Sequence, residues 1–361
     1  MNNEELYIDY LMDQRVRRKT NKPDKLHQIY SNKYANWVIP FLNEHGILEV
    51  PPLIFCNTLY RLPDYFGLEG KFFFLFDYYL YDYIYDLNYS LYEDENNEYM
   101  FNLWIKVYME NLYLRDNIDM CYKFCITTPD LESYKKSEKY KNHDLMYRIV
   151  ELSDVQEAVI LLHEASHFFY ENYNLNVKKS STYKEVVEIF CKYRQKYQYD
   201  ISLLKMISES EFDTEGLLEE CYCDSESIKF VLKEVYKKLN INKKDLFIQI
   251  FRTILSVYFL HYIMSITERD KENYNDYHMQ QLTYRLGNMY LIILSFLAEN
   301  DGIEYKELLD SVYIQQVEQF ASWGRKMRQF SGIIKDELKD FDMEEVEDEK
   351  KETIKEYLAL L

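Results

Sequence analysis

The stretch Val159-Ile160-Leu161-Leu162-His163-Glu164-Ala165-Ser166-His167-Phe168 places an H-E-x-x-H pattern directly after an unbroken apolar run. The run predicts a helix that is buried on most sides. Residues four apart lie on one face of a helix, so His163 and His167 can both reach one ion at ~2.0–2.1 Å. Burying two histidines and a glutamate without a metal or polar partners is costly. The stretch therefore predicts a buried helix that carries a zinc site.

This helix is expected to begin at Ser153, since Ser153 and Gln156 have the spacing of a capping box, and to run to about residue 174. Further helical patterns cover about 183–198, 214–240, 244–268, 276–299 and 303–330. The chain has 37 Tyr and 21 Phe but only 8 Gly and 6 Pro, so turn-formers and helix breakers are scarce. We expect a mainly α fold.

Three regions of the chain differ in composition and in sequence pattern. Residues 1–145 contain the aromatic run Phe72–Tyr92 and the alternating stretch Met120–Ile126, which predicts a strand in a small sheet. This region is a candidate for substrate or partner recognition. Residues 146–334 form a helical core that contains the predicted zinc site. Residues 335–361 hold 11 acids and 5 lysines, which is typical of a solvated acidic tail.

Composition excludes several classes of protein. The formal net charge of −19 repels phosphate backbones, and the basic cluster at 325–328 is too small to reverse that field, so a nucleic-acid partner is not expected. The apolar stretch Leu246–Ile266 is interrupted by Arg252 and His261, which argues against a membrane partner. The N-terminal residues do not resemble an export signal, and the six cysteines match no disulfide framework. We expect a cytoplasmic protein.

Glu164 directly follows the first histidine, so its side chain points beside the metal toward the open coordination position. That is the place for a general base that takes a proton from water. A histidine-acid-x-x-histidine pattern arises by chance about 0.02 times in a chain of this composition.

The third metal ligand is expected on a second helix, in Leu217-Leu218-Glu219-Glu220-Cys221-Tyr222-Cys223-Asp224. Glu220 and Asp224 are four apart, so Glu220 can bind the metal while Asp224 accepts the outer N–H of a ligand histidine. Glu219 points about a quarter-turn away and is the rival ligand. A zinc site with cysteine ligands, or a redox-sensing one, remains an alternative at Cys221 and Cys223.

These two motifs resemble the gluzincin branch of zinc metallopeptidases, in which H-E-x-x-H on one helix is completed by E-x-x-x-D on a later helix. The resemblance spans residues 163–224 and implies a zincin-like fold: a small mixed sheet packed on the active-site helix, followed by a helical lower half. It implies that His163, His167 and Glu220 bind zinc, that Glu164 is the base and that Asp224 supports a ligand.

The chain departs from the gluzincin pattern in two ways. Ala165 stands where a larger apolar residue is usual, and 53 positions separate His167 from Glu220, more than in compact members. A helix over about 183–197 could fill that gap. The metzincin pattern is excluded, because Tyr170 and Tyr173 occupy its glycine and third-histidine positions.

A later segment, 277–286, is weakly similar to intracellular phage-exclusion Lit-like peptidases, which carry a His followed by an Arg near the start of a late helix. His278 and Arg285 occupy those places, and Met279 replaces a frequent proline. His278, Tyr277 or Arg285 could donate to an oxyanion. The alternative is that His278 caps a helix and Arg285 pairs with a surface acid.

The sequence thus predicts a zinc-dependent endopeptidase of narrow specificity, which acts on a protein or peptide and is controlled by a regulatory protein partner. Two alternatives stay open. One is a catalytically silent, zinc-binding sensor or interaction module with a zincin-like shape. The other is a helical structural protein without metal.

Overall fold

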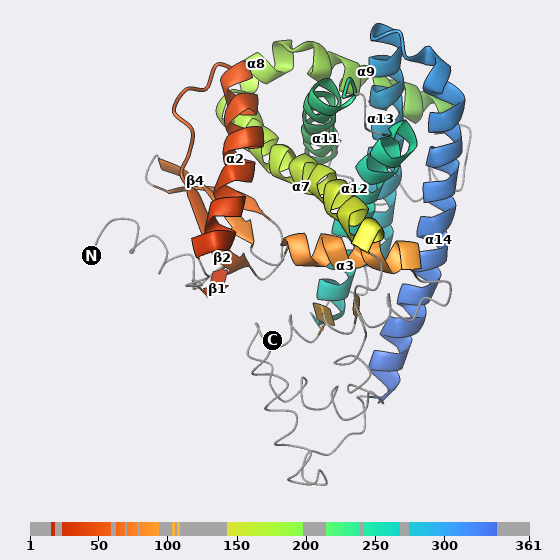
Figure 1. Ribbon diagram of the computed structural model, residues 1–361. Coiled ribbons are helices and arrows are strands. Elements are labelled where there is room, and N and C mark those ends of the chain that lie inside the picture. The colour runs from red at the N-terminus through yellow and green to blue at the C-terminus, as the bar shows by residue number, and fades with distance from the viewer. Residues whose placement is uncertain are drawn as a thin grey trace.

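The computed structural model describes residues 16–18, 24–58, 63–68, 71–77, 80–93, 103–104, 107–108, 143–197, 214–238, 242–267 and 274–337. In these ranges the protein is mainly α-helical, as the sequence predicts, with one small sheet near the N-terminus (Figure 1). The predicted strand Met120–Ile126 and most of the acidic tail lie outside the described residues.

The sheet contains β1 (Val16–Arg18), β2 (Leu53–Thr58), β3 (Asp64–Leu68) and β4 (Lys71–Asp77) in the order β1-β2-β4-β3. The β2–β4 pair is parallel, whereas β1–β2 and β3–β4 are antiparallel. The sheet is therefore mixed. Two parallel strands cannot be joined by a tight hairpin, so the chain needs a longer connection between β2 and β4. Strand β3 lies on this connection and pairs with β4 at the edge of the sheet. Helix α2 (Asp24–Glu44) precedes β2, and α3 (Leu80–Glu93) follows β4.

The remaining helices are α7 (His143–Asn172), α8 (Asn174–Lys179), α9 (Ser181–Tyr197), α11 (Thr214–Val235), α12 (Lys243–Thr267), α13 (Tyr274–Glu299) and α14 (Lys306–Glu337). A single 3-10 turn, η1 (Ile303–Tyr305), precedes α14. Four of the helices predicted from the sequence start within two residues of α9, α11, α12 and α13. The last predicted helix starts three residues before α14, which runs seven residues beyond the expected end. Helix α9 occupies the long gap between the two motifs.

Helix α7 passes through the centre of the molecule, and α2, α3, α11 and α12 all pack against it (Figure 1). The run Val159–Leu162 is buried on every side, as its unbroken apolar character predicts. Ala165 is also fully buried, so the small residue lies inside the core. The H-E-x-x-H motif therefore lies on a helix that four other helices enclose.

The predicted start of this helix at Ser153 is wrong. Helix α7 begins ten residues earlier, and Ser153 is a buried interior residue whose hydroxyl accepts a hydrogen bond from Asn88 of α3. The capping-box spacing of Ser153 and Gln156 serves a tertiary contact, because the Asn88 amide also donates to the Gln156 side chain. None of the described helices combines the length and apolarity needed to cross a membrane.

Candidate metal centre

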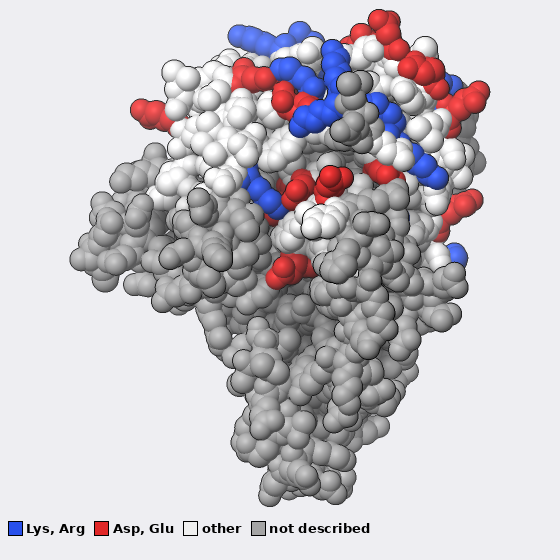
Figure 2. Space-filling view, in the orientation of Figure 1, with Lys and Arg blue, Asp and Glu red and all other residues white. Residues whose placement is uncertain are grey.

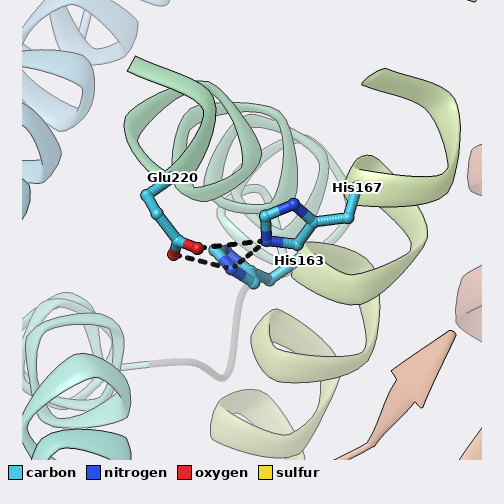
Figure 3. A group of neighbouring side chains, drawn as sticks. All are labelled: His163, His167 and Glu220. Carbon is cyan, nitrogen blue, oxygen red and sulfur yellow. Dashed lines mark hydrogen bonds and ion pairs between the residues drawn. The ribbon is translucent and has the colours of Figure 1, made fainter. Parts of the chain in front are cut away.

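Helices α7 and α11 bring His163, His167 and Glu220 together, and their side chains point toward one another (Figure 3). The two histidine Nε2 atoms are 3.0 Å apart. The Glu220 carboxylate oxygens lie 3.3 Å from Nε2 of His163 and 3.5 Å from Nε2 of His167. One potential ligand atom of each residue lies within 4.8 Å of the others. The three residues proposed from sequence as ligands thus converge on one point.

The outer nitrogen of each histidine faces a carboxylate of α11. Nδ1 of His163 lies 2.9 Å from Asp224 Oδ1, and Nδ1 of His167 lies 2.8 Å from Glu219 Oε1. Such contacts favour a proton on Nδ1 and orient the ring. The Asp224 contact is the one that the motif spacing predicts. The Glu219 contact is new, since sequence reasoning treats Glu219 only as a rival ligand.

This protonation pattern makes the centre rich in acceptors. With protons on both Nδ1 atoms, each neutral ring presents a lone pair at Nε2. Two lone pairs then face each other across 3.0 Å, beside a carboxylate that can only accept. The two histidines and Glu220 supply no donor to one another in this state, so a cation or an added proton is needed between them. Two imidazoles and a carboxylate are the donor set of a catalytic zinc site, so these residues fit zinc.

The pKa values follow from the same arrangement. Burial alone lowers the pKa of His163, but Asp224 and Glu220 outweigh it and raise that pKa. Burial also opposes protonation of His167, yet Cys223, Glu219 and Glu220 hold its pKa well above the usual value. Zinc binding at this centre would therefore compete with protonation of the histidines.

Arg285 of α13 contacts two acidic side chains of the centre, Asp224 and Glu220. Its Nε and Nη2 lie 2.8 Å from the two oxygens of Asp224, and its Nη1 lies 2.8 Å from Glu220 Oε2. Burial disfavours the charged forms, but Arg285 and the histidines still hold the pKa of Glu220 well below its usual range. Arg285 thus pairs with the buried Asp224 and the partly buried Glu220 and holds both carboxylates in place. Its guanidinium is thus already engaged by the acids, whereas the sequence suggested an oxyanion donor or a surface pair.

The other candidates from the sequence have different positions. Glu164 lies between the two histidines on α7 and is partly exposed. His278 and Tyr277 belong to the first turn of α13, and their side chains lie outside the described part of the chain. Cys221 and Cys223 are buried, and Cys223 hydrogen-bonds His167. Burial raises the pKa of Cys223 to about 12.

Sequence reasoning missed Tyr65 of β3. Its phenol hydrogen-bonds Glu171, one turn after His167, and interacts electrostatically with His167 and Glu219. An aromatic residue in a short strand carries no motif, and only the packing of β3 against α7 brings it to the centre.

The face in Figure 2 shows acidic side chains near its middle, around a hollow, and Lys and Arg side chains mainly above them toward α8 and α9. Lys178 and Lys179 are exposed on α8. Acidic side chains also lie along the upper edge of this face (Figure 2). A molecule that approaches the middle of the face meets negative charge.

Comparison with family models, with curated proteins and with solved structures finds no match for this chain. The geometry of the centre is therefore the ground on which a function can be argued.

Proposed function

We propose that the protein is a zinc-dependent endopeptidase of gluzincin type, with a zincin-like arrangement of sheet and active-site helix. The observation that carries the proposal is the convergence of two histidine Nε2 atoms and the Glu220 carboxylate, with both outer nitrogens facing carboxylates. That supporting layer of acids is typical of metal-binding histidines. The cytoplasmic location expected from the sequence belongs to the same proposal.

The chemistry divides between the ion and the chain. Zinc would polarise the scissile carbonyl and acidify a water molecule. His163, His167 and Glu220 hold the ion, and Asp224, Glu219 and Arg285 hold those three side chains in place. Glu164 accepts the proton that the attacking water loses and delivers it to the leaving amine, so that one water and one amide give a carboxylate and an amine.

Glu164→Gln is the test of this function. The variant keeps the shape of the side chain and every metal ligand but removes the base, so zinc content should stay the same while cleavage falls about 10²–10⁴-fold. Zinc is measured by atomic spectroscopy, and cleavage is measured as new termini in a proteome digest incubated with the zinc-loaded protein.

Glu151→Gln is the matched control, since Glu151 is exposed on the same helix α7. It should behave as wild type in both measurements. If Glu164→Gln and wild type generate the same termini at the same rate, the peptidase proposal is wrong and a non-catalytic zinc protein becomes the better interpretation.

A further inference from the structure

An aromatic cluster joins the edge of the sheet to the active-site helix. In the β3–β4 ladder Tyr65 lies opposite Phe74, and Gly67 lies opposite Phe72. Side chains two apart on a strand share one face of the sheet, so Phe72 and Phe74 point the same way. Their rings and the ring of Tyr65 surround Phe168 of α7, with centroid distances of 5.1, 5.9 and 6.1 Å.

The four rings are buried to different degrees. Phe74 and Phe168 are core residues, each 4% exposed. Tyr65 and Phe72 pack on the core but remain partly exposed. Strand β3 is the edge of the sheet within the described residues, so no described strand lies beyond it. The two outer rings therefore leave apolar surface open to solvent at this edge.

That surface is next to the candidate metal centre. Phe168 directly follows His167, and the Tyr65 phenol is held by Glu171 within electrostatic range of His167 and Glu219. The ring of Tyr65 packs on Phe74 and Phe168, which orients it. An apolar wall of fixed orientation thus adjoins the place where a bound peptide would be cleaved.

We propose that Tyr65 and Phe72 form the wall of a substrate subsite that takes a large apolar or aromatic side chain beside the cleaved bond. The inference rests on the proposed endopeptidase function and adds the class of substrate. Rings that meet edge-on or offset attract each other beyond the effect of buried area. Apolar pockets distinguish side chains by roughly 10–200-fold per missing group, so a preference of at least about 10-fold for Phe over Ser is expected.

The experiment uses the zinc-loaded full chain and a peptide library with each position varied. Wild type should favour Phe, Tyr, Leu or Met at one position flanking the cleaved bond. Tyr65→Ser should lower the ratio of kcat/KM for a Phe peptide to that for its Ser counterpart about 10-fold. Tyr65→Phe, which keeps the ring, should retain the preference. Tyr305→Ser is the control, since Tyr305 packs on Tyr236 at η1.

A binding measurement separates recognition from turnover. The same two peptides are titrated into Glu164→Gln with and without Tyr65→Ser, and the Phe peptide should lose about 10-fold in affinity while the Ser peptide changes little. Cleavage without apolar preference, or an unchanged preference in Tyr65→Ser, overturns the subsite. Loss of all cleavage in Tyr65→Phe with zinc retained also overturns it, because the hydroxyl would then act in catalysis. A wild type that cleaves no peptide defeats the proposed function instead.

Discussion

Helix α7 carries two buried polar clusters two turns apart, and they differ in how donors and acceptors are balanced. In the first, Gln156 accepts from Asn88 and donates to Gln249 at 2.6 Å, so its amide both gives and receives a hydrogen bond. In the second, the Nε2 atoms of His163 and His167 face each other beside the Glu220 carboxylate, and all are acceptors once the outer nitrogens hold protons. At Gln156 the chain itself therefore supplies both a donor and an acceptor, whereas the acceptors of the second cluster need a cation between them.

The Lys33–Glu157 pair sharpens the contrast. Glu157 is fully buried and bonds Lys33 of α2, which also lies 2.9 Å from Asp154. A lysine from the same chain thus provides the positive charge. At the metal centre Arg285 provides one positive charge, but it contacts Asp224 and Glu220 rather than the histidine Nε2 atoms. Acids packed against α7 therefore form an ion pair at one place and a candidate ligand site at the other.

The largest expected effect is loss of metal. Wild type purified without chelator should hold close to one zinc per chain, and His163→Ala or His167→Ala should remove it. Gln156→Leu, which breaks the structural network two turns away, should keep the zinc. It should lower the free energy of unfolding by about 1–3 kcal/mol, because Gln249 and Asn88 lose a buried partner. Equal zinc in the double histidine variant and in wild type would end the metal assignment.

Next in size is the effect of the carboxylates that orient the histidines. Asp224→Ala and Glu219→Ala should each weaken zinc binding about 10–100-fold, because each frees one histidine ring, while Glu220→Ala removes a ligand and should cost more. A competing chromophoric chelator measures the affinities. The control is Glu215→Ala, one turn before Glu219 and exposed. If Glu219→Ala matches this control, the 2.8 Å contact with His167 has no role in binding.

The smallest expected effect is a pH dependence at the structural cluster. Burial, opposed by Lys33, raises the pKa of Glu157 to about 7 from an ordinary value of 4.5. The folded state therefore holds the proton more tightly than the unfolded state. Stability from this group is present below pH about 4.5 and is lost as the pH rises through about 7. Relative to the Glu157→Gln variant, wild type should lose at most about 3 kcal/mol of unfolding free energy as the pH rises from about 4.5 to about 7.

Lys33→Met tests the cause of this pH dependence. Without the lysine, burial acts unopposed, so the loss of stability should extend to higher pH than in wild type. Denaturant unfolding at a series of pH values measures both variants, and zinc content should change in neither. A wild-type profile parallel to that of Glu157→Gln between pH 4.5 and 7 would mean that Glu157 is ionised in the fold.

Much of the architecture could be predicted from local pattern. The helices α9, α11, α12 and α13 begin close to the expected residues, because apolar residues repeat with helical period and few Gly or Pro interrupt them. The start of α7 could not be predicted in this way. Ser153 has the spacing of a helix cap, but its hydroxyl accepts a hydrogen bond from Asn88 of α3. A capping residue and a buried polar residue look alike until the neighbouring element is known.

At the site, the sequence alone determined that His163 and His167 share one helix face and that Glu220 and Asp224 share another, because the i,i+4 spacing is a property of any α-helix. Only the tertiary structure decided that Glu219 faces His167, that Arg285 holds Asp224 and Glu220, and that Tyr65 adjoins the centre. These contacts join residues 52, 61 and 102 positions apart. Local periodicity places side chains on their own helix, whereas the packing of α11 against α7 and α13, and of β3 against α7, decides which of them meet.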